Sequence, residues 1–154
     1  MTAHTFHYMT VIRNHVEAVR EIFCDIYGSS RKKEIGVLMR LCYHKACFGV
    51  VSFDADEPAG FILLQQAGHT ADVIELGVRA RLRSQGIGRD LLEHGLRLSN
   101  EHGIKRVMLE VEVTNKAAYK LYRSSGFELL GKRPHYYQRK KESIDALILE
   151  RYLD

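Results

Sequence analysis

The sequence of 154 residues has no tryptophan, only two prolines and only three cysteines. With so little proline, no linker divides the chain, and we find no internal repeat or low-complexity segment. The cysteines, Cys24, Cys42 and Cys47, are odd in number and lack metal or redox spacing, so we expect them to be reduced, mostly buried and not catalytic. No apolar run approaches the roughly 20 residues that span a bilayer, and the N-terminus lacks a signal-peptide pattern. We therefore expect a cytoplasmic protein without a membrane segment.

The composition that is present is typical of a globular domain. Apolar residues make up 45% and charged residues 27%, which argues against disorder. We expect one domain over residues 1–154, because roughly 70% of the unfolded surface can be buried at this length. The net charge of +4 lies largely in residues 79–89 and 133–141 and suits an anionic small ligand. No aromatic residues interleave the arginines of residues 79–89, so we expect no direct nucleic-acid binding.

Hydrophobic periodicity predicts alternating strands and helices. Strands are predicted at residues 6–11, 48–53, 60–65, 71–78, 106–112, 127–138 and 143–152, and helices at residues 14–27, 31–42, 86–102 and 116–125. The first part reads as a hairpin meander and the second as strand–helix–strand–helix–strand. This order predicts the α/β class, with a single mixed sheet of six to seven strands and helices on both faces.

A glycine-containing loop, Arg-Ser-Gln-Gly-Ile-Gly at residues 83–88, joins a predicted strand to a predicted helix. Backbone N–H groups at a helix start are unpaired and, with the helix dipole, attract anions. Gly86 and Gly88 would let phosphate oxygens approach the backbone. A dinucleotide fingerprint needs a third glycine where Leu91 stands, and a Walker loop needs Gly-Lys-Ser/Thr, which is absent. Two glycines alone leave phosphate binding and simple helix packing both open.

The longer pattern is more specific. Arg-x-x-Gly-x-Gly after a strand, followed by Leu91-Leu92 on the helix, resembles the acetyl-CoA motif of the GNAT acetyltransferase superfamily. The pieces that follow agree with this resemblance and are similar to the RimI-type ribosomal-protein alanine N-acetyltransferases: Leu109-Glu110-Val111, Thr114-Asn115, Ala117-Ala118, Leu121-Tyr122, Ser125-Gly126-Phe127 and Arg133-x-x-Tyr136-Tyr137. The resemblance covers residues 71–150, whereas residues 1–70 agree only as a pattern of two helices and a hairpin. It implies the GNAT fold.

The resemblance also implies how acetyl-CoA would bind. The pantetheine arm would hydrogen-bond the strand before the loop, and the pyrophosphate would lie on the loop and first helical turn. The implied cofactor-binding residues are Leu76, Gly77, Val78, Arg83, Ser84, Gln85, Gly86, Ile87, Gly88 and Arg89. Asn115 resembles the family's asparagine near the pantetheine, and a role as a helix cap is compatible with that. Ser84 departs from the Arg or Lys often found there, so one phosphate-facing charge is missing.

By the same resemblance Glu110 is the candidate general base and Tyr122 the candidate general acid, 12 residues later. Without the resemblance, Glu110 reads as a surface glutamate on an alternating strand and Tyr122 as a core tyrosine. Asp72 and Glu75 on the preceding strand are rival bases.

The adjacent Tyr136 and Tyr137 are candidate substrate-binding residues. On a strand their rings should point to opposite faces, so that one lines the peptide channel and the other packs. His94 and His102 have no partners at metal spacing, and we expect no metal.

The resemblance implies acetyl transfer from acetyl-CoA to the α-amino group of a protein N-terminus, such as that of a ribosomal protein. An α-amine with a pKa near 8 loses its proton at pH 7.4 at a cost under about 1 kcal/mol, against about 4 kcal/mol for a lysine near 10.4. The alternatives are an acetyltransferase for a lysine side chain or a small-molecule amine, a non-catalytic CoA-binding module, and a nucleic-acid-binding domain. We expect a monomer or weak dimer.

Overall fold

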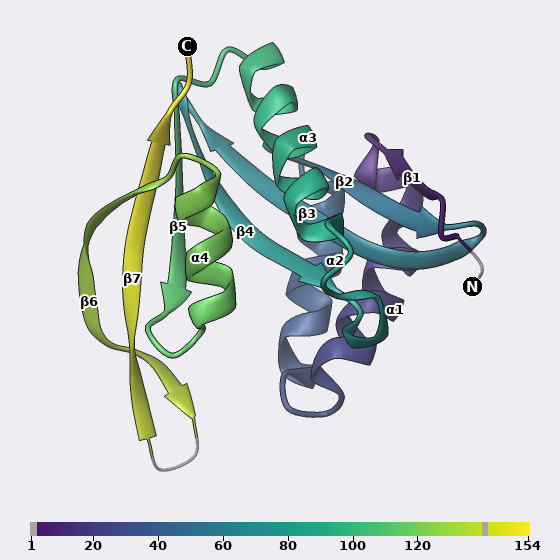
Figure 1. The fold of residues 1–154 in the computed structure, drawn as a ribbon, viewed down its shortest axis with the longest axis horizontal. Coiled ribbons are helices and arrows are strands. Elements are labelled where there is room, and N and C mark those ends of the chain that lie inside the picture. The colour runs from purple at the N-terminus through teal and green to yellow at the C-terminus, as the bar shows by residue number, and fades with distance from the viewer. Residues whose placement is uncertain (1–2, 140–141) are drawn as a thin grey trace.

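The computed structural model describes residues 3–139 and 142–154, and in them seven strands form one sheet in the order β1-β2-β3-β4-β5-β7-β6 (Figure 1). The strands are β1 (Phe6–Met9), β2 (Cys47–Asp54), β3 (Glu57–Ala67), β4 (Thr70–Val78), β5 (Arg106–Glu112), β6 (Glu128–Arg139) and β7 (Glu142–Tyr152). All neighbours are antiparallel except β4 and β5, which are parallel. The predicted α/β class with a mixed sheet is confirmed.

Helices cover both faces of the sheet, α1 and α2 on one and α3 and α4 on the other (Figure 1). They are α1 (Val16–Tyr27), α2 (Ile35–Tyr43), α3 (Ile87–Glu101) and α4 (Lys116–Ser124). The first two begin later than predicted because short 3₁₀ turns, Ile12–His15 and Lys32–Glu34, precede them. Gly28, with φ of 54°, ends α1 as its sequence position predicted.

The central strand β3 is buried on both faces. Phe61, Ile62, Leu63 and Leu64 are fully inaccessible to solvent. Ile62 and Leu64 pack toward α3, whereas Phe61 and Leu63 pack toward α1 and α2. A strand covered on both sides needs apolar residues at every position, which explains this uninterrupted run.

The two parallel strands at the middle of the sheet separate. β4 and β5 pair only over residues 70–72 and 106–108. In β4, Glu75 opposes Leu63 and Val73 opposes Leu64, so Ile74 is an extra residue that makes a β-bulge. Because a bulge bends its strand, β4 turns away from β5 beyond Asp72. The edge of β4 that faces β5 is therefore left without a strand partner beyond this point, among the described residues.

All three cysteines are free thiols. Cys42 is buried, but Cys24 and Cys47 are partly exposed, so the predicted burial holds fully for one of the three. Within the described ranges, none of the helices combines the length and the apolar character needed to cross a membrane.

Candidate active site

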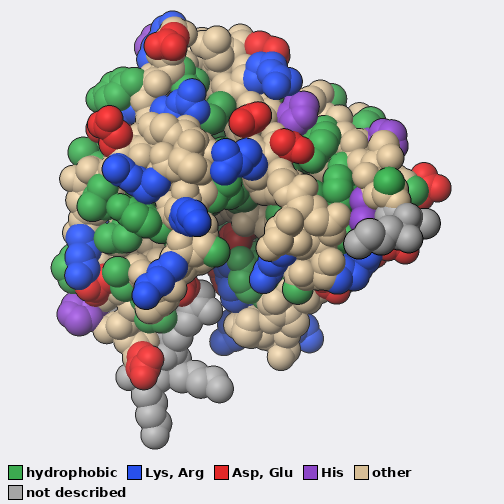
Figure 2. All heavy atoms as spheres, viewed as in Figure 1, with side chains coloured by type: hydrophobic (Ala, Val, Ile, Leu, Met, Phe, Trp, Pro, Cys, Tyr) green, Lys and Arg blue, Asp and Glu red, His purple; other side chains and the backbone are tan. Residues whose placement is uncertain are grey.

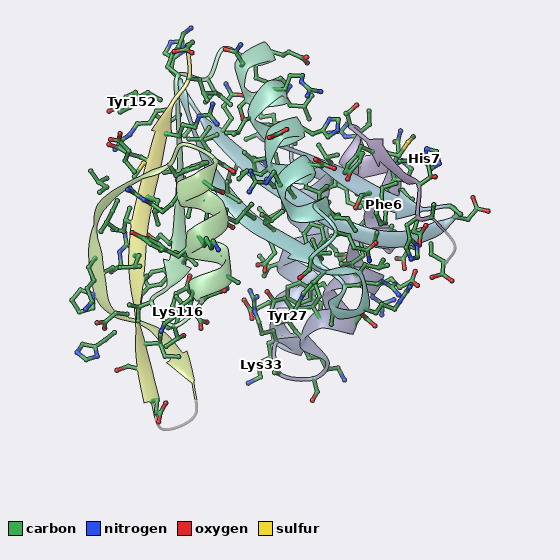
Figure 3. All side chains as sticks on the ribbon, in the orientation of Figure 1. Phe6, His7, Tyr27, Lys33, Lys116 and Tyr152 are labelled. Carbon is green, nitrogen blue, oxygen red and sulfur yellow. The ribbon has the colours of Figure 1, made fainter. Side chains whose placement is uncertain are left out.

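A cavity of about 1040 Å³ lies where β4 and β5 separate. Figure 2 shows the hollow between the two halves of the molecule, and Figure 3 places Tyr27, at the end of α1, and Lys116, at the start of α4, on its two sides. Eight of the residues singled out from the sequence line this cavity: Asp72, Glu75, Leu76, Glu110, Asn115, Tyr122, Tyr136 and Tyr137. The proposed cofactor residues from Gly77 to Arg89 do not line it, since they follow at the end of β4 and the start of α3.

Glu110 projects from β5 into the cavity, with its side chain 24% exposed. Its Oε1 lies 3.0 Å from Nη2 of Arg133 on β6. The Arg133 guanidinium also lies over the ring of Tyr136, 4.9 Å from its centroid. A hydrogen bond to Glu110 and burial raise the pKa of Tyr136, against the opposing effect of Arg133. Glu110 is thus held between a cation and a phenol, and Arg133 is a site residue to which the sequence assigned no role.

Tyr122 reaches the cavity from α4, on the opposite face of the sheet. Its side chain is buried and meets Phe127 edge to face, with ring centroids 5.8 Å apart. Its hydroxyl has no hydrogen-bond partner among the residues that the structure describes. Burial, with the nearby negative charge of Glu75, raises the pKa of Tyr122 far above its usual value. The ring is part of the core, so the interpretation as a core tyrosine is confirmed, and because the residue also lines the cavity its role as general acid stays a prediction.

Tyr136 and Tyr137 both line the cavity, which corrects the expectation that one of them faces away. Their rings meet edge to face with centroids 4.9 Å apart. The reason is a bulge in β6: Arg133 opposes Ala146 and Tyr137 opposes Ile144, so three residues face one. The bulge breaks the strict alternation of a strand. Burial and the neighbouring phenol of Tyr136 raise the pKa of Tyr137 to about 12.

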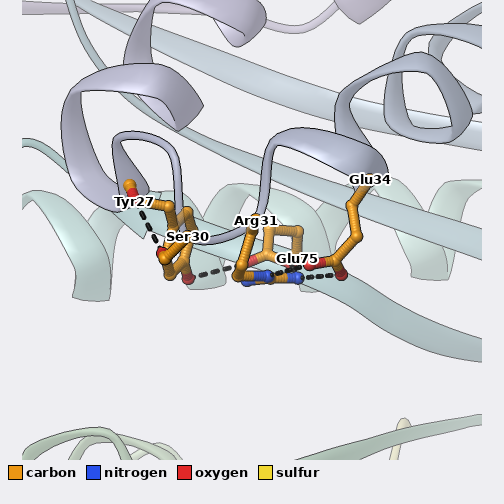
Figure 4. Close-up of polar contacts among 5 residues, drawn as sticks. All are labelled: Tyr27, Ser30, Arg31, Glu34 and Glu75. Carbon is orange, nitrogen blue, oxygen red and sulfur yellow. Dashed lines mark hydrogen bonds and ion pairs between the residues drawn. The ribbon is translucent and has the colours of Figure 1, made fainter. Parts of the chain in front are cut away.

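Glu75, one of the rival bases, belongs to a hydrogen-bonded network at the rim of the cavity (Figure 4). Its Oε1 accepts a hydrogen bond of 2.8 Å from the Tyr27 hydroxyl, and both oxygens accept from Arg31 at 3.2 Å. Arg31 also donates to Glu34 at 2.6 and 2.7 Å and lies 4.3 Å from the ring centroid of Tyr27. Through these contacts Glu75 ties the α1–α2 connection to β4. No sequence signal linked Arg31 with a carboxylate on β4.

Asp72, the other rival, lies where β4 and β5 begin to separate. It pairs with Met108 in the sheet, two residues before Glu110 on the same face of β5. Burial and the charge of Glu110 raise the pKa of Asp72, while Arg106 opposes the shift. It is a second carboxylate next to Glu110, with a weaker tendency to ionise than usual.

The glycine loop has the geometry of an anion site. Gly86 is the N-cap of α3 and takes a left-handed conformation, with φ of 85°, that other residues rarely adopt. No described side chain caps this helix, so its first N–H groups are available to a bound anion. A Cβ at Gly86 would meet nothing within 4 Å, whereas one at Gly88 would point at Leu121 and Val78, 3.5 and 3.8 Å away. Open space above Gly86 and a dipole directed at it fit a pyrophosphate.

The arginines beside this loop already have partners. Arg83 donates from Nε to the Val78 carbonyl at 3.1 Å, and Arg89 donates to the Ser124 hydroxyl at 3.1 Å. Ser84, where the resemblance leads one to expect a cation, adopts a left-handed φ of 62°. The loop therefore offers mainly backbone N–H groups to an anion.

Asn115 combines two positions. Its Oδ1 accepts a hydrogen bond of 3.2 Å from the Ala118 N–H, so the predicted helix cap is confirmed, and the residue also lines the cavity.

Within the described ranges no cluster of three or more histidine, cysteine, aspartate or glutamate side chains could hold a metal ion.

A sheet split between two parallel strands, with a helix start at its edge and a carboxylate and a phenol at the split, defines a candidate acyl-transfer enzyme. Residues 16–127 match the acetyltransferase (GNAT) family, and the chain belongs to this family of N-acetyltransferases. Membership implies the use of acetyl-CoA.

Two curated relatives are similar to this chain over about 60% of its length. The ribosomal protein bS18-alanine N-acetyltransferase of Escherichia coli K12 is 34% identical over 91 residues, 59% of this chain and 62% of the relative. The uncharacterized protein ML0378 of Mycobacterium leprae is 36% identical over 101 residues, 63% of this chain. The match spans only 27% of the Mycobacterium protein, so this chain corresponds to a part of it.

Solved structures share the fold over nearly the whole chain. The crystal structure of the E. coli ribosomal-protein-S18-alanine N-acetyltransferase superposes with a TM-score of 0.84 at 22% identity, over 96% of this chain and 94% of that one. Arabidopsis thaliana NAA60, in complex with a bisubstrate analogue, gives 0.81 at 15% identity, over 96% of this chain and 98% of that one. Likeness at this identity establishes the GNAT fold.

Proposed function

We propose that this chain transfers an acetyl group from acetyl-CoA to the α-amino group of a protein N-terminus, such as that of a ribosomal protein, in the cytoplasm. The observation that carries the proposal is the cavity at the β4–β5 split, lined by Glu110 from one face of the sheet and Tyr122 from the other. The ribosomal acceptor is supported by the name of the E. coli relative.

Acetyl-CoA would enter along the separated edge of β4. The backbone of Leu76, Gly77 and Val78 would hydrogen-bond the pantetheine arm, and the N–H groups of residues 84–89 would hold the pyrophosphate. Asn115 also lines the cavity and would contact the arm near its sulfur. The Val78 carbonyl is hydrogen-bonded to Arg83, so that contact would have to open or be shared.

When bound, acetyl-CoA supplies an acetyl group activated as a thioester. The Glu110 carboxylate would accept, through water, the proton that the acceptor ammonium must lose before its nitrogen bonds to the carbonyl carbon. As the carbon–sulfur bond breaks, the Tyr122 hydroxyl would give its proton to the sulfur, and the second proton that the nitrogen loses as the amide forms would return, through water, to the Tyr122 oxygen. Its raised pKa keeps Tyr122 protonated at neutral pH, so its proton is present when the carbon–sulfur bond breaks. Tyr136 and Tyr137 would contact the first residues of the acceptor.

The chemistry of the acceptor favours an α-amine. Losing its proton at pH 7.4 costs an α-ammonium under about 1 kcal/mol, which a carboxylate acting through water can meet, whereas a lysine requires about 4 kcal/mol. The fold alone does not select the acceptor. A lysine side chain or a small-molecule amine is therefore the alternative to be tested.

The test is acetylation of a library of peptides with free N-termini, read by mass spectrometry, beside lysine peptides with blocked N-termini and spermidine. We expect the acetyl group on the α-nitrogen of a subset of the free peptides. Modification confined to lysine side chains or spermidine would overturn the proposal, and so would calorimetry that detects no acetyl-CoA binding.

A further inference from the structure

The bulge in β6 determines how close the two cavity tyrosines lie to Glu110. If β6 continued its regular pairing with β7, Tyr137 would oppose Glu142, whereas it opposes Ile144. Two residues of a strand span roughly 7 Å, and Ile144 is nearer than Glu142 to the residue of β7 that opposes Glu110. The bulge therefore brings Tyr137 closer to Glu110 by about that distance. It also turns Tyr136 into the cavity, although in a regular strand this ring would point to the other face.

The carboxylate of Asp145 on β7 holds this bulge. Its Oδ1 accepts a hydrogen bond of 2.8 Å from the backbone N–H of His135, in the middle of the bulge. Its Oδ2 lies 3.0 Å from Nζ of Lys132, which precedes the bulge. The His135 N–H and the Lys132 ammonium lower the pKa of Asp145, so the carboxylate is charged at neutral pH. The backbone of Asp145 is itself fixed, because its carbonyl accepts a hydrogen bond of 2.9 Å from the N–H of Val113, just after β5.

The backbone of the bulge needs contacts of this kind. His135 has a φ of 54°, in the left-handed region that residues other than glycine rarely adopt. Pro134 beside it has no N–H to donate to β7. The ring of His135 contacts β7 as well, with Nδ1 2.6 Å from Oγ of Ser143. An unfavourable backbone conformation persists only where its surroundings stabilise it. The hydrogen bond to Asp145 is the one that the backbone N–H of the strained residue makes.

Asp145 does not line the cavity, so it would not touch an acceptor there. We infer that Asp145 is a positioning residue, which holds the bulge of β6 and thereby keeps both Tyr136 and Tyr137 in the cavity, where they contact the acceptor. The contact with the acceptor rests on the proposed function, whereas the placement of the two rings does not.

The first test reads the register between β6 and β7 from nuclear Overhauser contacts in the isotope-labelled full chain, and it needs no turnover. Asp145→Ala should lose the contact between Tyr137 and Ile144, because the backbone N–H of His135 loses its acceptor. Asp145→Asn retains an oxygen for that N–H and should keep the contact. The matched control Lys132→Gln removes only the ion pair and should keep the contact too.

The second test is steady-state kinetics with a peptide that the parent protein acetylates. In Asp145→Ala we expect the KM for the peptide to rise about tenfold, while kcat and the KM for acetyl-CoA stay within about twofold of the parent. The reason is that Glu110 and Tyr122 lie on β5 and α4, outside the bulge. A general loosening of the fold would instead lower kcat. Asp145→Asn and Lys132→Gln should keep all three values within about twofold of the parent.

An unchanged register in Asp145→Ala, or an unchanged KM for the peptide, would overturn the inference. Equal losses in Asp145→Ala and Asp145→Asn would also overturn it, because the charge and not the hydrogen bond to His135 would then matter. A changed register beside a parent protein that acetylates no peptide would keep the placement of the rings and overturn the proposed function. If Asp145→Ala does not fold, the double variant His135→Gly/Asp145→Ala is the test, because glycine adopts the left-handed backbone without strain. A restored contact between Tyr137 and Ile144 would support the inference, and a double variant that stays unfolded would overturn it.

Discussion

The two halves of the sheet are built differently. In the first half α1 packs on β3 and β4 while α3 packs on β2, β3 and β4, so the central strands have a helix on each side. In the second half Leu121 and Tyr122 of α4 share a core with Leu109 and Val111 of β5, whereas the side chains on the other face of β5, Met108, Glu110 and Glu112, line the cavity. The burial of the strands differs accordingly. β3 is buried at six consecutive residues, whereas β5 alternates between buried and partly exposed residues along its whole length.

This difference separates two tasks. In the proposed function, the backbone groups for acetyl-CoA would come from the end of β4 and the start of α3. Glu110, Tyr122 and the two cavity tyrosines come from β5, α4 and β6 of the second half. In the proposed function, the half with helices on both faces would present the cofactor site, and the half-sheet with one open face would present the reacting groups to the acceptor.

The largest expected effect is on turnover, from Glu110→Gln and Tyr122→Phe. Each should lower kcat by about 10²–10⁴, because each removes a proton-transfer group. Both should keep the free energy of unfolding within about 1 kcal/mol of the parent, since Tyr122→Phe retains the ring contact with Phe127. Steady-state kinetics beside urea denaturation tests this. Intact turnover in both variants would disprove the assigned mechanism. A large loss of stability in either variant would mean that these side chains also hold the fold together, so that catalysis and stability are not separate.

The stability side of the comparison is tested by matched truncations in the two halves. Phe61→Ala, in the doubly covered strand β3, should lower the free energy of unfolding by about 3–5 kcal/mol. Met108→Ala, on the open face of β5, should lower it by less than about 1 kcal/mol. Equal losses in urea titrations would show that the second half is as tightly packed as the first.

A middle-sized effect is expected from Arg31→Gln, which detaches the α1–α2 connection from β4. The partly buried Glu75 then loses its guanidinium, and we expect a loss of about 1–3 kcal/mol. Adding Glu75→Gln to this variant should recover part of the loss. A double-mutant cycle by chemical denaturation measures the coupling, and additive losses would mean that the pair contributes nothing.

The smallest effect is expected from Asp72→Asn. Because its pKa is raised in the folded state, the ionised Asp72 carboxylate opposes folding, so the variant should be more stable at neutral pH by a few tenths of a kcal/mol. The gain should be constant above the raised pKa, shrink as the pH falls, and vanish below the usual value near 3.9. Thermal unfolding from pH 3 to 8 checks the sign. A hundredfold fall in kcat would instead make Asp72 the base.

Much of the fold was predictable because its signals are local. The run Phe61 to Leu64 marked a strand, Gly28 and Gly126 marked helix ends, and Asn115 marked a helix start, and each lies where it was expected. The orientation of Tyr136 and Tyr137 was predicted wrongly, since alternation assumes a regular strand and β6 contains a bulge.

The candidate site was predictable as a set of residues but not as an arrangement. Glu110 and Tyr122 could be named from motif spacing, yet the partners of the site, Arg31 with Glu75 and Arg133 with Glu110, are far apart in the chain. Ion pairs of this kind produce no periodic pattern in the sequence, because each partner alone cannot be distinguished from an ordinary exposed charged residue.

Residues close together in the chain thus determine the α/β fold class. The hydrophobic period, the placement of glycines and the helix caps act within a few residues, and they specify the strands, the helices and the glycine loop. The bulge at Ile74, the separation of β4 from β5 and the cavity between them depend on how distant strands pack. They depend on which residues of distant strands pair and on which charged side chains the pairing brings together. No short stretch of residues contains that information.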